Sequence, residues 1–151
     1  MAQGRASGAN LSDILRKVEQ RLEGVQKLFL LGLAEDIVNT SPVDSGAYVN
    51  GHNIQAGVGS AAGQFTGNLT KGATSPNPQG EKDQAMSKLR GQVESLPKDL
   101  TVVSINNRVP HAAKVEYGGW ASRGPYAVYS SALNRANIHL KDAIAKVKGS
   151  T

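Results

Sequence analysis

A chain of this length must build its core around the long apolar repeat near its N-terminus. Large apolar side chains recur there at steps of three and four residues. That spacing aligns them on one face of a helix with 3.6 residues per turn. The repeat predicts an amphipathic helix over residues 11–39, ending shortly before Pro42. Its members are Leu11, Ile14, Leu15, Val18, Leu22, Val25, Phe29, Leu33 and Ile37.

Some polar residues and glycines in this segment affect where the predicted helix starts and how stable it is. Asn10 can cap its start, and Asp13 in the first turn suits the helix dipole. Gly24 and Gly32 lie inside it, and each weakens a helix by ~1 kcal/mol relative to Ala. Packing along the apolar face can outweigh that cost, and a bend at the glycines is possible. Residues 1–9, which precede the repeat, are expected to be a flexible tail.

The segment after the helix reads as an ordered turn. Pro42 fixes one dihedral angle, Asp44 can accept hydrogen bonds from nearby backbone amides, and Gly46 permits a positive φ. Residues 47–58 then carry apolar side chains at even spacing, as a half-buried strand does. The pair Asn50-Gly51 instead favours a hairpin turn, so these residues support two conflicting interpretations.

Residues 57–80 are rich in Gly, Pro, Ser, Thr and Asn. Phe65 is one of only three sizeable apolar side chains there, so the segment buries too little surface to order itself alone. We expect a flexible, projecting arm or insertion that a partner orders.

The remaining periodicity predicts an α+β fold in one domain over residues 1–151. A small antiparallel sheet is expected to be covered by the first and last helices. Asn77-Pro78 suits a helix start, and a short helix that begins near Pro110 should end at Gly118. The further predicted elements are a helix over 80–95, a strand over 100–106, a helix over 110–117 and a helix over 125–148.

Composition narrows the function. The chain has no Cys, hence no disulfide or thiolate site. It has no signal-peptide pattern and no apolar run of the ~20 residues that a membrane span needs, so no membrane role is expected. Residues 121–151 carry +4 of the net charge of +5. Such a segment suits phosphate, an acidic protein or solubility. Scarce aromatic residues disfavour single-strand binding, so a protein partner is preferred.

Catalytic patterns are lacking. The three His residues lie far apart in sequence, without metal-ligand spacing. No nucleophile elbow or phosphate-binding lysine loop occurs, and the glycines of residues 57–63 lack the strand and helix of a dinucleotide site. The sequence therefore predicts no enzyme, no cofactor and no metal.

Three segments occur in an order that suggests a family. They are Ser41-Pro-Val-Asp-Ser-Gly46, then Val103-Ser-Ile-Asn-Asn-Arg-Val-Pro-His-Ala-Ala-Lys-Val-Glu-Tyr-Gly118, then Gly124-Pro-Tyr-Ala-Val-Tyr-Ser-Ser-Ala-Leu133. Together they resemble the tail-completion or neck proteins of long-tailed bacteriophages. The chain departs from that pattern at His111, usually Tyr, and at His52, where an aromatic strand residue is expected. The resemblance favours one continuous strand over residues 47–58.

The resemblance implies a structural virion protein made in the host cytoplasm and located in the neck or tail. It would form a ring, expected to be a hexamer, that joins the tail to the connector. Its partners would be further copies of itself, the connector or head-completion protein and the tail-terminator or tail-tube protein. Non-specific contact with DNA in the lumen is possible.

Several residues are candidates for turn formation or assembly. Asp44 suits turn capping better than an interface. Glu116 suits equally an inter-subunit salt bridge and an exposed charge. Trp120 favours an interface, because it lies in a glycine-flanked loop and Trp is enriched at binding hot spots. The full set is Pro42, Asp44, Gly46, Phe65, Glu116, Tyr117, Gly118, Trp120, Arg123 and Pro125.

Two other functions are compatible with the sequence. The basic C-terminal helix suits a small nucleic-acid-binding module, which salt-sensitive duplex binding by a monomer would support. A hydrolase that uses His111 and Glu116 is a third possibility.

Overall fold

The computed structural model describes residues 2–57, 73–98, 102–118 and 125–149, with side chains from residue 11 onward. These residues form the predicted α+β fold of helices and an antiparallel two-stranded sheet. In chain order the elements are α1 (Ala2–Thr40), the short 3-10 helix η1 (Val49–Gly51), β1 (His52–Ala56), α2 (Pro78–Glu94), β2 (Val103–Asn107), α3 (Ala112–Tyr117), α4 (Val128–Asn134) and α5 (Ala136–Gly149).

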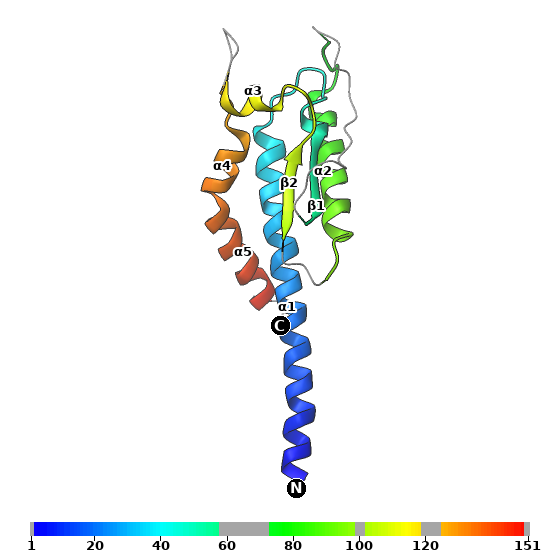
Figure 1. Cartoon of the computed structure of the whole chain (residues 1–151), viewed down its shortest axis with the longest axis vertical. Helices are drawn as coiled ribbons and strands as arrows, with labels where there is room; N and C mark the ends of the chain where they lie inside the picture. Colours follow the sequence, from blue (N-terminus) through cyan, green and yellow to red (C-terminus); the bar gives the residue numbers. More distant parts are fainter. Residues whose placement is uncertain (1, 58–72, 99–101, 119–124, 150–151) are drawn as a thin grey trace.

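α1 is the axis around which the other elements are arranged (Figure 1). The sheet and α2 lie beside its second half, with α4 and α5 along another side and α3 at the far end. β1 and β2 pair from His52–Asn107 to Ala56–Val103. At β1, the Gln92 side-chain oxygen of α2 accepts the Ile54 amide at 2.7 Å. The Gln92 side chain thereby provides a hydrogen-bond acceptor for the Ile54 amide of β1, which does not bond to β2.

The core consists of two apolar clusters, and the second half of α1 contributes to both. The first lies between α1, α2 and the sheet, and it contains Leu30, Ala34, Val38, Val49, Ile54, Ala85, Leu89 and Val93. The second lies between α1, α3 and α4, and it contains Ile37, Ala47, Tyr48, Val109, Val115, Val128 and Ala132. Of the predicted apolar repeat, Ile37 is a buried member of a cluster and Leu33 packs against it, whereas the first cluster takes Leu30, Ala34 and Val38, which lie outside that repeat.

Gly24 and Gly32 are points of α1 at which α5 approaches it. A Cβ atom on Gly32 would lie 2.6 Å from Nδ1 and 2.9 Å from Cγ of His139, and one on Gly24 would lie 3.2 Å from Val147. The same His139 ring is fixed from its other nitrogen, because Nε2 lies 2.5 Å from the Asp36 carboxylate of α1. The close packing of α5 explains why α1 tolerates glycine there.

Three element boundaries differ from the sequence predictions. The strand expected over 47–58 is wrong in its first part, because residues 48–51 turn through η1 and β1 begins at His52. The helix expected over 125–148 is divided into α4 and α5 at Arg135. α1 begins at Ala2, so Asn10 lies within it rather than at its cap. The helices predicted over 80–95 and 110–117 are confirmed, and Asn77 does cap α2, accepting the Gly80 amide at 3.0 Å.

We expect Gly32→Ala to lower the free energy of unfolding, although it raises helix propensity by ~1 kcal/mol. The new methyl group must displace the His139 ring, which Asp36 holds. Gly91→Ala in α2 is the matched control, since its Cβ would meet no atom within 4 Å. It should raise stability by up to ~1 kcal/mol. Urea unfolding of both variants checks this, and equal gains in both would contradict the packing explanation.

Candidate assembly surface

The turn after α1 is built around Gly46 and Glu81. Gly46 has φ +92°, and a Cβ there would lie 2.5 Å from the Glu81 carboxyl group. That carboxylate accepts hydrogen bonds from the Asn50 side chain at 2.7 Å and the Ser75 hydroxyl at 3.0 Å. The positive φ predicted for Gly46 is confirmed, and a second reason for glycine, the approach of α2, could not be read from the sequence.

The other turn residues have lesser contacts. Pro42 is half-buried, and Asp44 is exposed. The backbone carbonyl of Asp44 accepts the Ser75 amide at 2.6 Å. The segment that follows α1 is thereby tied to the residues that lead into α2.

His52 is the most buried polar side chain near this turn, with 1% of its surface exposed. Its Nε2 lies 2.8 Å from the Ser41 hydroxyl, and its Nδ1 lies 2.6 Å from the Tyr129 hydroxyl. The side-chain amide of Asn107 lies 3.1 Å from the same Nδ1 and donates to the Tyr48 carbonyl at 2.8 Å. One imidazole therefore joins the end of α1, both strands and α4.

The hydrogen-bond pattern assigns the tautomer of His52. The Ser41 hydroxyl donates to the Ile37 carbonyl at 2.6 Å, so toward His52 it can only accept. Nε2 then carries the proton, and Nδ1 accepts from Tyr129. Both ring nitrogens of the neutral His52 side chain therefore have hydrogen-bond partners. Burial, reinforced by the charge of Lys88, lowers the pKa of His52 to about 3. The Ser41–His52 pair is a structural contact, since Ser41 too is only 3% exposed.

Glu116 has a role that neither prediction anticipated. It is not an exposed charge, because it is buried and caps α4. Its carboxylate accepts the amides of Tyr129 and Ser130, each at 2.9 Å, and the Ser130 hydroxyl at 2.6 Å. Burial would raise the pKa of Glu116, but these hydrogen bonds outweigh it and the pKa is lowered. With both oxygens engaged, Glu116 is not placed as the base of a hydrolase.

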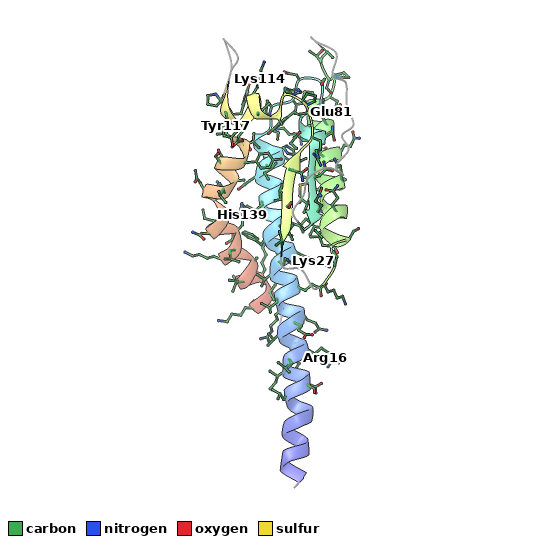
Figure 2. All side chains as sticks on the ribbon, in the orientation of Figure 1. Arg16, Lys27, Glu81, Lys114, Tyr117 and His139 are labelled. Carbon is green, nitrogen blue, oxygen red and sulfur yellow. The ribbon has the colours of Figure 1, made fainter. Side chains whose placement is uncertain are left out.

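The remaining candidates divide into two groups. Tyr117 is 80% exposed and lies with Lys114 at the end of the domain opposite the free end of α1 (Figure 2). Gly118 ends α3 with φ +90° and lies beside Pro125, as its predicted role in helix termination requires. Phe65, Trp120 and Arg123 lie outside the described residues, as does most of the predicted 57–80 arm.

The largest exposed apolar feature is the first half of α1, which projects alone beyond the domain (Figure 1). Five large apolar side chains there are each exposed by 43% to 64%. They belong to the same repeat that forms the core further along α1. We call this set the α1 stripe; its members are Leu11, Ile14, Leu15, Val18 and Leu22.

A second apolar face lies along α4 and α5. Leu133 is 73% exposed, and Leu140 and Ile144 are also exposed. We call these three side chains the α4–α5 face. The exposed Lys141 and Lys148 lie beside this face on α5, whereas Lys146 and Asp142 lie on the opposite side of the helix.

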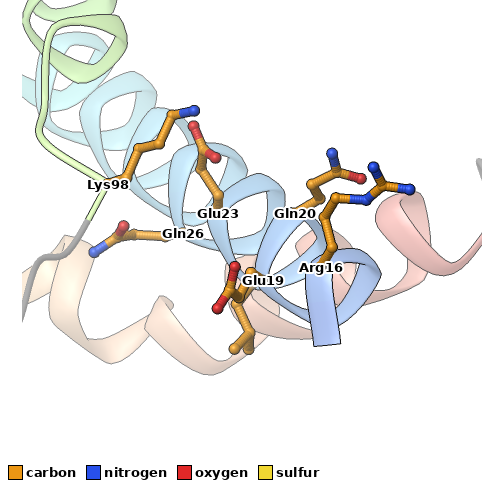
Figure 3. Close-up of a pocket in the computed structure, with 7 residues that line it drawn as sticks. Arg16, Glu19, Gln20, Glu23, Gln26 and Lys98 are labelled. Atoms are coloured by element: carbon orange, nitrogen blue, oxygen red, sulfur yellow. The ribbon is translucent and has the colours of Figure 1, made fainter. Parts of the chain in front are cut away.

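The hollows on the surface do not resemble a ligand site. One lies beside the α1 stripe and is lined mainly by charged and amide side chains of α1 together with Lys98 (Figure 3). Enclosed ligand pockets are mostly apolar with a few convergent polar groups, which this open hollow is not. Among the described residues, no three His, Cys, Asp or Glu side chains are grouped to hold a metal ion. Their helices also include none both long and apolar enough to cross a membrane.

Comparisons with known proteins identify no relative. No protein-family model matches the chain, and no curated protein or solved structure is significantly similar to it.

Sequence reasoning missed two features of this surface. The α1 stripe was assigned to the core, because periodicity shows which side chains share a face but not how far along the helix other elements cover it. His52 was noted only as a departure from an aromatic pattern. The signal available for it was its place between a turn and a strand, which is too weak to predict a buried network.

The depressed pKa of His52 makes stability fall in mild acid. Below about pH 6.5 the unfolded chain binds a proton at His52, whereas the folded chain does not until about pH 3. The stabilisation is complete above that window and is lost as pH falls through it, at up to ~1.4 kcal/mol per pH unit. Urea unfolding between pH 7 and 5 should show this slope. His52→Gln should flatten it while lowering stability throughout; if His111→Gln flattens it instead, the assignment is wrong.

We expect Glu116→Gln to lower the free energy of unfolding by ~1–2 kcal/mol, because one amide at the start of α4 loses its charged acceptor. Glu35→Gln on the exposed side of α1 is the control and should change stability by less than ~0.5 kcal/mol. Thermal unfolding near neutral pH compares the two. An equally small effect at both positions would mean that the cap is not needed.

Proposed function

We propose that this chain is a non-enzymatic structural protein of a long-tailed bacteriophage. It forms part of the neck or tail-completion ring, expected to be hexameric, that joins the tail to the connector. The resemblance of the Ser41–Gly46, 103–118 and 124–133 segments to such proteins names the family. The α1 stripe is the observation that carries an assembly role.

The size of the stripe supports a protein partner. Five large apolar side chains about half exposed offer on the order of 500 Å² of apolar surface, and contiguous patches of that size on soluble proteins mark interaction sites. A second support is the domain from which the stripe projects. The buried side chains of His52 and Glu116 are hydrogen-bonded within it, which suits a scaffold.

The experiment that tests this function is the mass of the purified protein, alone and mixed with connector or tail-tube preparations of the same virus. We expect binding to one of them, with a discrete ring as the product. A monomer that ignores both and binds duplex DNA with a steep salt dependence would contradict the proposal. The basic α5 would then make a nucleic-acid-binding module the better account.

A further inference from the structure

The chain exposes two apolar helical faces, the α1 stripe and the α4–α5 face. The stripe lies on a part of α1 that no other described element reaches, so no helix or strand of the described residues covers it (Figure 1). From Ala2 to Leu22 the helix extends about 30 Å at 1.5 Å per residue, comparable with the width of a small domain. A second copy lying beside the first is within its reach.

The two faces match in spacing. Leu133, Leu140 and Ile144 are separated by seven and then four residues. In the stripe, Leu11, Val18 and Leu22 are also separated by seven and then four residues. Leu11, Leu15 and Leu22 are separated by four and then seven residues. On α1 such intervals place side chains in one ridge, whereas on the other face Leu140 and Ile144 share a row of α5 and Leu133 lies in α4 beyond Arg135. The four-residue step of α5 therefore has a counterpart on the stripe whichever way the two helices run.

Charge argues against pairing of the α4–α5 face with itself. A symmetric contact between two α5 helices would bring together two copies of the exposed Lys141 and Lys148, which lie beside Leu140 and Ile144 in a helix with 3.6 residues per turn. Like charges brought together across an interface disfavour that contact. The stripe carries a more balanced set, with Asp13 and Glu19 against Arg16, Lys17 and Arg21. The α4–α5 face is thus better covered by a stripe than by its own counterpart.

We propose that the α1 stripe of one copy docks on the α4–α5 face of the next copy. Each copy then binds one neighbour through its α1 stripe and the other neighbour through its α4–α5 face. This contact joins unlike surfaces, so it closes into a ring when the rotation between copies permits. The exposed parts of these eight side chains amount to roughly 800 Å², which is small for a specific interface, whereas a copy in a closed ring makes two such contacts. The inference rests on the proposed ring, and it names the surfaces that join its subunits.

Two charge-introducing variants test the contact. Leu22→Glu breaks the stripe, and Leu140→Glu breaks the face; each alone should reduce the oligomer to the monomer mass. Mixed one to one, they should form a dimer and nothing larger, because only one contact between them is intact. Gln20→Glu and Ala145→Glu add the same charge at exposed positions outside the two sets and should keep the mass of the unaltered protein.

The absence of Cys allows a second measurement that detects weak contacts. A chain carrying Leu15→Cys and a chain carrying Leu140→Cys, oxidised together at the highest soluble concentration, should form the mixed disulfide in preference to either homodimer. Lys17→Cys, on the exposed part of α1 but outside the stripe, is the control and should not cross-link.

The outcomes separate this contact from the proposed function. Loss of the oligomer in Leu22→Glu alone, with a Leu15→Cys homodimer, would mean that the stripe pairs with itself and would overturn the docking. A monomer without cross-links would overturn it too. Binding of the connector or tail tube by such a monomer would leave the proposed function intact. Self-association through the two faces without binding to either would instead overturn only the proposed function.

Discussion

The buried imidazole of His52 joins parts of the chain that no other single side chain connects. Ser41 follows α1, Asn107 ends β2 and Tyr129 lies in α4, and all three meet the same ring. Burying so many polar groups is tolerable only when each is paired, because an unpaired one costs about 1–3 kcal/mol. The geometry of the turn, the register of the sheet and the position of α4 are therefore interdependent. A shift in any one of them would leave a polar group buried without its partner.

α1 is the second constraint, because one continuous apolar repeat has two uses. From Leu30 onward it lies between two core clusters. Before Leu22 the same periodicity continues into solvent. The glycines lie at and after this change, where α5 packs closely. The small glycine residues at these positions let α5 lie close to α1. α5 ends near Gly24, and the described domain does not cover α1 before that point.

Periodicity predicted the helices and the sheet because it depends on local patterns of burial. The errors occur where long-range contacts decide the local conformation. The turn signal of Asn50-Gly51 conflicted with the even apolar spacing over residues 47–58. Contacts of Lys88 with the Asn50 carbonyl and of Glu81 with the Asn50 side chain decide in favour of the turn. Glu116 appeared to be a surface charge because the helix it caps begins twelve residues later. Such contacts join residues far apart in sequence, so no window of sequence contains them.

The exposed half of α1 differs from the rest of the molecule in what stabilises it. A helix of about twenty residues without tertiary contacts is marginal in water, since most helical stability in proteins comes from packing of the apolar face. Among the residues that the structure describes, nothing packs on that face, although its sequence keeps the apolar pattern unbroken. Selection for solubility alone would favour polar side chains at Leu11, Leu15 and Leu22. The proposed contact between copies would account for these side chains, because burial of the stripe would stabilise the helix and the interface together.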